Sequence, residues 1–262
     1  MQFAANLSML FSADTAFADR CRRVVEQGFQ SVEILFPYEK PAEQYQSQLE
    51  QYGLQSILIN TPNQEGDFGY AALPGREKDF KAAFDTALKV SQTLGTKAIH
   101  VMAGKFGLES PDDWVNTLYS NIQYALKKVE GTNVVLHLEA LNSVDVPTYA
   151  YSNPLELLPI IKDLNHPQLG LQFDFYHTLM QGYDLLAVLE KCLPYIKHVQ
   201  IANPHGRNEP NFKKNPQLLA GLNMLAASKY KGVIGLEYYP SSNFEESLGF
   251  LDQYLRQAPT TQ

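Results

Sequence analysis

The chain has 262 residues, of which 45% are hydrophobic, enough to build the core of one large domain or two small ones. A net charge of −7 argues against an extended phosphate-binding surface, so nucleic acid is not an expected partner. The sequence has no long apolar run and no signal-peptide pattern at its start, which predicts a soluble, cytoplasmic protein that does not associate with membranes.

Short runs rich in β-branched and aromatic residues recur along the whole chain. They follow one another at intervals of roughly 25 to 45 residues, which is typical of strands that alternate with helices. Between them lie segments with apolar residues at helical spacing; one begins at Phe17 and ends at Gly28, and another runs from Phe80 to Gly95. In chain order, the expected strands are residues 2–8, 31–36, 55–60, 97–102, 134–140, 169–175, 197–202 and 232–238.

Eight strands that alternate with helices predict an α/β protein, a (β/α)8 TIM barrel with its chemistry at the C-terminal ends of the strands. No linker or low-complexity stretch divides the chain, so residues 1–262 are expected to form a single domain. A doubly wound open sheet is the alternative fold. No G-x-G-x-x-G motif follows the first strand, however, so a dinucleotide site of that kind has no support.

Side chains along each strand point alternately to the two faces of the sheet. In the last four strands, one alternating set is apolar and is expected to face the helices: Leu136, Leu138, Leu171, Phe173, Val199, Ile201, Ile234 and Leu236. The other set is mostly polar and is expected to face the barrel axis: His137, Glu139, Gln172, Asp174, His198, Gln200, Gly235 and Glu237. The same division of the first four strands puts these on the inner side: Asn6, Ser8, Glu33, Ser56, Asn60 and His100.

In the segment "LQFDFYHTLMQG", a carboxylate ends an apolar strand. Buried carboxylates are costly unless they are paired or bound to a cation. Four successive strands end in oxygen donors, namely Glu139, Asp174, Gln200 and Glu237. Such an oxygen-only set suits Mg²⁺ or Mn²⁺ better than Zn²⁺, which usually recruits histidine or cysteine. The sequence therefore predicts a divalent metal site here; the alternative is four solvated strand ends with local hydrogen bonds.

Motifs spread over nearly the whole chain resemble those of a known family. In order they are "ANLSMLF", "VEILFPY", "ALPGRE", "IHVMAG", "LEALN" with "PTY" behind it, "QFDFYH", "HVQIA", "RNEP" and "LEYYP". Together they resemble the hydroxypyruvate isomerase family of xylose-isomerase-like TIM barrels. That group also contains ketose 3-epimerases and endonuclease IV.

The resemblance implies a divalent metal ion held by the residues that match Glu139, Asp174, Gln200 and Glu237. It also implies that the two glutamates move a proton, so that a small hydroxy-oxo acid or sugar is isomerised through a cis-enediolate. Hydroxypyruvate and 2-oxo-tetronate are substrates of this type. Ketose 3-epimerases usually have histidine at the position of Gln200, so the glutamine favours the hydroxypyruvate isomerase branch.

Three positions depart from the family pattern. Relatives commonly have histidine where this chain has Asn208, and they often have glutamine where it has Leu179. The ending "E-Y-[RK]-P" becomes "EYYP", so Tyr239 stands in the place of a cation. If that cation holds a substrate carboxylate, its loss puts hydroxypyruvate itself in doubt.

Five further residues are predicted to bind substrate, each with a structural alternative: His177, Arg207, His100, Glu33 and Arg76. His177 could donate to a substrate oxygen or hydrogen-bond the backbone of its loop. Arg207 could bind an oxyanion or pair with a nearby glutamate. His100 and Glu33 could contact substrate or belong to a buried polar network. Arg76 could reach the site or anchor its own loop.

Other functions on the same scaffold remain open from the sequence alone. A ketose 3-epimerase would use the same enediolate but return the proton to the same carbon from its other face. A polyol dehydratase and a noncatalytic sugar-binding relative are further alternatives. An endonuclease IV-like phosphodiesterase would need a histidine-rich cluster for three zinc ions, and the six histidines are not arranged in that way. The partner expected is a small molecule, and the sequence is compatible with a homo-oligomer.

Overall fold

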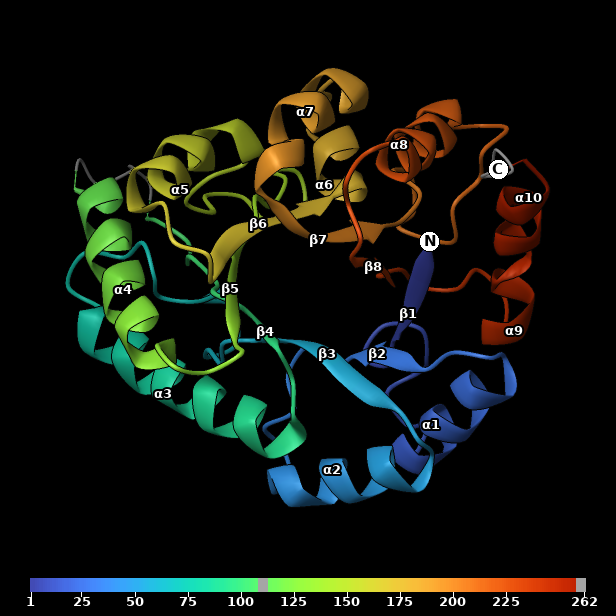
Figure 1. The fold of residues 1–262 in the computed structure, drawn as a ribbon, viewed down its shortest axis with the longest axis horizontal. Helices are drawn as coiled ribbons and strands as arrows, with labels where there is room; N and C mark the ends of the chain where they lie inside the picture. The colour runs from blue at the N-terminus through green and yellow to red at the C-terminus, as the bar shows by residue number, and fades with distance from the viewer. Residues whose placement is uncertain (108–112, 258–262) are drawn as a thin grey trace.

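The structure, a computed structural model, describes residues 1–107 and 113–257. Eight parallel strands close into a barrel in chain order, and helices surround it (Figure 1). The strands are β1 (Gln2–Asn6), β2 (Ser31–Glu33), β3 (Gln55–Asn60), β4 (Ala98–His100), β5 (Val135–Leu138), β6 (Leu169–Asp174), β7 (Ile196–Ile201) and β8 (Val233–Leu236).

Pairing of the first strand with the last closes the barrel. Their register runs from Gln2 opposite Val233 to Ala5 opposite Leu236, and all neighbouring pairs are parallel. This closure confirms the predicted (β/α)8 TIM barrel and rules out the open doubly wound sheet. Several strands are shorter than the apolar runs that predicted them; β4, for example, covers only residues 98–100 of the expected 97–102.

The outer layer consists of helices, and sequential helices α1 to α4 pack side by side. The α-helices are α1 (Phe17–Glu26), α2 (Ala42–Gln51), α3 (Glu77–Leu94), α4 (Trp114–Val129), α5 (Leu158–Leu164), α6 (Phe175–Met180), α7 (Leu185–Cys192), α8 (Pro216–Ala227), α9 (Phe244–Ser247) and α10 (Gly249–Gln257). Two short 3₁₀ helices are η1 (Pro154–Leu157) and η2 (Leu193–Tyr195).

Helix α3 shows how the sequence determines these boundaries. Acidic side chains occupy its first turn, where they interact favourably with the helix dipole. Phe80, Phe84 and Leu88 recur at intervals of four and form its buried face. The helix ends at Gly95, whose φ of 68° lies in the left-handed region that glycine adopts without strain.

The two faces of the sheet differ in polarity as predicted. The eight apolar side chains assigned to the outer face of β5 to β8 are fully buried in the core between strands and helices. Apart from the half-buried Ser8 and the glycine Gly235, the side chains assigned to the inner face are also buried, but they are polar, and many bond to one another across the barrel. The barrel interior is therefore a hydrogen-bonded polar layer rather than an aliphatic core. Within the residues that the structure describes, no helix has the length and apolar character needed to span a membrane.

Candidate active site

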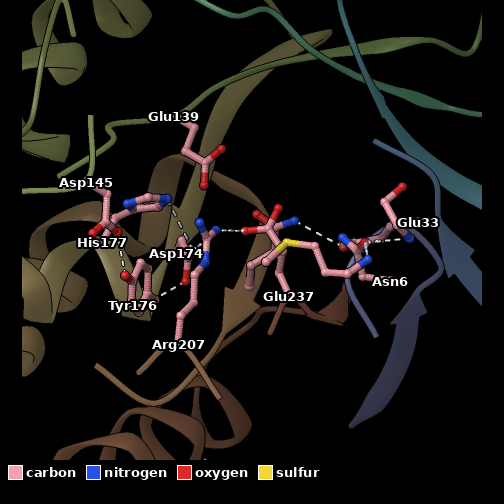
Figure 2. Close-up of polar contacts among 12 residues, drawn as sticks. Asn6, Glu33, Glu139, Asp145, Asp174, Tyr176, His177, Arg207 and Glu237 are labelled. Atoms are coloured by element: carbon pink, nitrogen blue, oxygen red, sulfur yellow. Dashed lines mark hydrogen bonds and ion pairs between the residues drawn. The ribbon is translucent and has the colours of Figure 1, made fainter. Parts of the chain in front are cut away.

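Three carboxylates from different strands meet at the C-terminal end of the barrel. Glu139 follows β5, Asp174 ends β6 and Glu237 follows β8. With His177 of α6, each places one ligand atom within 4.8 Å of the others, and all four side chains are buried (Figure 2). The parallel barrel brings them together because the ends of all its strands open on the same side.

Two of these carboxylates each keep one oxygen atom without a hydrogen bond. Glu139 Oε2 accepts from Gln172 Nε2 at 2.7 Å, whereas its Oε1 has no partner among the described residues. Asp174 Oδ1 caps helix α6 by accepting from the backbone N–H of Tyr176 at 2.8 Å, whereas its Oδ2 is likewise unbonded. Buried anionic oxygens without a donor are unstable, so this geometry fits a cation between them.

The electrostatics of the cluster support the same interpretation. Burial, reinforced by the charge of Glu237, raises the pKa of Asp174 to about 8. Burial and the neighbouring acids also raise the pKa of Glu139 well above its ordinary value, and burial raises that of Glu237. A divalent cation would remove the mutual repulsion that produces part of these shifts.

Gln200, the predicted amide ligand, lies beside this cluster in β7. Its Oε1 accepts from Gln172 Nε2 at 2.7 Å, and the same nitrogen donates to Glu139. Its Nε2 donates to Glu33 Oε2 at 3.1 Å. The oxygen of the amide therefore lies on the Glu139 side and the nitrogen on the Glu33 side. All four predicted ligands thus lie in one connected region of the barrel mouth.

His177 has a defined tautomer. The backbone N–H of Asn142 donates to its Nδ1 at 3.1 Å, so Nδ1 is an acceptor. Burial lowers the pKa of His177 well below its ordinary value, so the ring is neutral and its proton is on Nε2. Nε2 lies 3.7 Å from Asp174 Oδ2. An N–H group in this position is a hydrogen-bond donor rather than a metal ligand. The bond from the Asn142 backbone is of the kind that the structural alternative predicts, and the role in substrate binding stays a prediction.

Arg207, from the loop after β7, lies against the acids. Its Nη2 donates to Glu237 Oε2 at 2.5 Å and lies 4.0 Å from Asp174 Oδ2. Its guanidinium stacks on the Tyr176 ring at 4.6 Å. Figure 2 shows the side chain beside the carboxylates. No ion pair with Glu209, the alternative partner, occurs among the described residues. The cation of the loop is therefore part of the site.

His100 also lies in the site. Its Nδ1 is 3.2 Å from Glu139 Oε2, and burial lowers its pKa to about 3, so the ring is neutral. Its Nε2 is buried and has no hydrogen-bond partner within residues 1–107 and 113–257. His100 also lines the cavity above the acids.

The two remaining predicted residues lie away from the cavity. Glu33 is fully buried and bonds to Asn6, His198 and Gln200, which is the polar-network alternative. Arg76 pairs with Asp79 and, at 3.6 Å, with Asp67, and thus anchors its own loop. Neither residue lines the cavity, so direct contact with substrate has no support from their positions.

A cavity of about 390 Å³ opens above the acids, large enough for a small molecule. His100, Glu139, His177, Arg207 and Glu237 form its polar floor. The apolar walls come mainly from loops, and the sequence predicted no role in the site for any of these residues: Met9, Leu35, Phe36, Phe68, Met102, Leu141 and Val146.

Sequence reasoning also missed residues that support the site. Asn142 holds His177 through its backbone and side chain, and Tyr176 donates to Asp145, which also accepts from Asn142 at 3.1 Å. Gln172 was assigned to the inner face but given no role. Its position two residues before Asp174, on the same side of β6, is the signal that could have revealed it.

Comparisons with known proteins agree with this fold. A profile of the xylose isomerase-like TIM barrel family matches residues 21–254. A putative hydroxypyruvate isomerase from Xenopus laevis is 32% identical over 98% of this chain and 96% of its own. A 2-oxo-tetronate isomerase from Pectobacterium atrosepticum is 33% identical over 97% and 98%.

Among solved structures, one titled AP endonuclease, family 2, from Brucella melitensis superposes with a TM-score of 0.87. It is 32% identical and covers 97% of this chain and 98% of its own. A D-psicose 3-epimerase from Clostridium cellulolyticum superposes with a TM-score of 0.74 at 17% identity, which shows a shared fold alone. These matches confirm the family resemblance found in the motifs. The chain belongs to the xylose isomerase-like TIM barrel family.

Proposed function

We propose that this protein is a metal-dependent isomerase of a small hydroxy-oxo acid or sugar, of the hydroxypyruvate or 2-oxo-tetronate type. Relatives that bear these names are 32% and 33% identical over nearly the full chain, which supports the isomerase class. The observation that carries the metal dependence is the acid cluster, in which Glu139 and Asp174 each keep a buried oxygen without a donor in the described part of the chain.

The ion would be Mg²⁺ or Mn²⁺, held by four residues at successive strand ends: Glu139, Asp174, Gln200 and Glu237. The oxygen donors of this set match the preference of these hard cations. When bound, such an ion supplies a Lewis acid that stabilises negative charge on two adjacent substrate oxygens, typically by several kcal/mol. His177 is outside this set because Nε2, the nitrogen that faces Asp174, carries a proton.

Glu139 and Glu237 would move the proton. One carboxylate removes a proton from the carbon next to the carbonyl, and the other, as an acid, returns one to the adjacent carbon. The proton of the neighbouring hydroxyl passes to the former carbonyl oxygen, so the carbonyl moves by one position through a cis-enediolate. Burial raises the pKa of both side chains, which favours the protonated form that the acid step needs.

Three neighbouring side chains would orient the substrate. The Nε2–H of His177 and the guanidinium of Arg207 are donors to substrate oxygens on the acid side of the cavity. His100 Nδ1 lies 3.2 Å from Glu139 Oε2; with its proton on Nδ1, the ring would offer Nε2 as an acceptor for a substrate hydroxyl. This division of donors and acceptors suits a hydroxy-carbonyl compound.

The competing functions differ in the observations that would support them. A ketose 3-epimerase uses the same enediolate, so only product analysis separates it from an isomerase. A polyol dehydratase would release water. A phosphodiesterase with three zinc ions needs several histidine ligands, but the metal-ligand cluster found among the described residues contains one histidine, and that one is a donor.

The test is a screen of hydroxypyruvate, 2-oxo-tetronate and small ketoses with Mg²⁺ or Mn²⁺ in deuterated water. Migration of the carbonyl supports an isomerase, whereas inversion at one carbon without migration supports an epimerase. Glu237→Gln removes a proton carrier and should lower kcat by about a thousand-fold. Unchanged turnover in that variant would remove Glu237 from the mechanism.

Glu209→Gln is the matched control. Glu209 is a glutamate near the same loops, but its carboxylate accepts from the backbone N–H of Ser241 at 3.0 Å and does not line the cavity. We expect this variant to keep its turnover. A similar loss of turnover in both variants would indicate a general effect on folding rather than a role of Glu237 in catalysis.

A further inference from the structure

A second layer of polar groups lies beneath the candidate metal ligands, centred on Glu33 at the end of β2. Its carboxylate accepts from Asn6 Nδ2 at 2.9 Å and from Gln200 Nε2 at 3.1 Å, both on Oε2. His198 Nε2 lies 2.5 Å from the other oxygen, Oε1. Glu33 has no exposed surface, so these bonds replace all of its hydration.

The barrel has a specific space for this carboxylate. Gly235 of β8 faces Glu33 across the interior, and a Cβ atom at position 235 would lie 2.0 Å from Glu33 Oε1. No side chain larger than glycine is compatible with that approach unless the carboxylate moves. The position of Glu33 is thus determined by the opposite side of the barrel as well as by its own strand.

A carboxylate in this place determines the direction of the Gln200 amide. An ionised carboxylate can only accept hydrogen bonds, so Gln200 must turn its NH₂ group toward Glu33. Its oxygen then lies on the other side, where it accepts from Gln172 Nε2 at 2.7 Å. The carbonyl oxygen of an amide has two lone pairs, and one of them remains for a further partner.

Gln172 completes the arrangement from β6. Its single amide nitrogen donates to Gln200 Oε1 and to Glu139 Oε2, each at 2.7 Å. Both protons of the NH₂ group are therefore used on two of the proposed metal ligands. Gln172 is 2% exposed, so water does not compete for these bonds. The amide keeps two oxygens from different strands at the same distance from one nitrogen.

We infer that Glu33 and Gln172 are positioning residues that hold the Gln200 amide with its oxygen toward the cation. The inference rests on the proposed function, because the cation is part of it. In this arrangement Gln200 serves as a neutral ligand whose orientation is set by donors and acceptors behind it. Groups of this kind commonly change metal affinity by about 10 to 100-fold when they are removed.

Calorimetric titration of the metal-free protein with Mn²⁺ tests this inference. Gln172→Met keeps the length of the side chain but removes both donors, and Glu33→Gln allows the Gln200 amide to flip. We expect each variant to raise the Kd for Mn²⁺ by about ten-fold or more. Circular dichroism checks that each variant is folded; should Glu33→Gln fail to fold, Gln172→Met decides alone.

Gln168→Met is the matched control. Gln168 immediately precedes β6, and its amide donates to the backbone oxygens of Val129, Thr132 and Val134 at 2.8 to 3.0 Å, away from the candidate metal ligands. This variant should lose stability but keep the Kd of the wild type. An equal rise of the Kd in the control would overturn the inference, because the effect would then come from destabilisation.

A double variant tests the orientation itself. In Glu33→Gln with Gln200→Glu, the donor and acceptor exchange sides, so an oxygen of residue 200 still faces the cation, now from a carboxylate with a donor behind it. We expect tighter Mn²⁺ binding than in Gln200→Glu alone, in which the same carboxylate faces the carboxylate of Glu33 without a donor behind it. A merely structural role of Glu33 does not predict this difference. Equal or weaker binding would overturn the inference. Absence of Mn²⁺ binding by the wild type would instead overturn the proposed function.

Discussion

The two halves of the barrel contribute different kinds of polar group. Strands β5 to β8 supply the candidate ligands, two of which keep an unbonded carboxylate oxygen. Strands β1 to β4 supply polar side chains that mostly have partners: Asn6 bonds to Glu33 at 2.9 Å, and Ser56 bonds to Thr96 at 2.7 Å. The second half therefore presents free ligand atoms, while the first half, through Glu33, holds the Gln200 amide.

The largest effect should follow from a change in the second half. Asp174→Asn removes one charge but keeps an oxygen that can cap α6. We expect the loss of measurable Mn²⁺ binding and a fall in turnover of at least about a thousand-fold, because the cation loses an anionic ligand. Metal titration and steady-state kinetics measure both quantities.

A second helix cap provides the control for this change. Asp184 caps α7 by accepting from the N–H groups of Leu186 and Ala187 at 3.0 and 3.2 Å. Asp184→Asn should leave metal binding and turnover unchanged. If Asp174→Asn binds Mn²⁺ as well as the wild type does, the free carboxylate oxygen in the second half has no role in holding a cation.

Alternation along single strands was sufficient to predict the candidate ligands. Glu139, Asp174, Gln200 and Glu237 follow from the period of two and from the shared end of parallel strands. The closed barrel follows from the same pattern, repeated eight times.

The supporting contacts could not be predicted in this way, because they depend on the stagger between strands. The register between β6 and β7 shifts at Leu171/Gln172, and this shift brings Asp174 opposite Gln200. Arg207 reaches Glu237 from a loop in which its own φ is 44°, a conformation uncommon for a residue other than glycine. Such contacts depend on strand register and loop conformation, which leave no regular pattern along the sequence.

A change in the contact between the halves should affect stability. Gly235→Ala places a methyl group against Glu33, so we expect a loss of about 1 to 3 kcal/mol in the free energy of unfolding, measured in urea. Gly249→Ala, at the start of α10, is the control, since no atom lies within 4 Å of the new Cβ and its φ is not left-handed. Equal stabilities of the two variants would mean that the interior adjusts without cost.

The pH dependence of the metal-free protein should reveal the repulsion in the second half. A carboxyl whose pKa is raised by folding contributes stability at low pH and loses it as the pH rises through the folded value, which is about 8 for Asp174. Histidines with lowered pKa, such as His177, change stability only below their ordinary value of 6.5.

The melting temperature with a chelator present should therefore fall by several degrees between about pH 6.5 and 8.5. Added Mn²⁺ should remove most of this dependence of the melting temperature on pH. In the absence of metal, Asp174→Asn should reduce the same dependence. A melting temperature that rises over this range would contradict the raised pKa values.

The smallest effect concerns the rim of the cavity, where Tyr239 replaces the cation of the family pattern. Tyr239 is 56% exposed, and its backbone N–H donates to the oxygen of Arg207 at 2.8 Å, which holds the residue beside the site. Tyr239→Lys should lower KM for oxo acids by a few-fold and leave KM for neutral ketoses unchanged, since an exposed ion pair contributes at most about 1 kcal/mol. The gain should disappear at high salt. Tyr239→Met is the uncharged control; if it lowers KM equally, the shape of the rim rather than its charge determines the preference for acids.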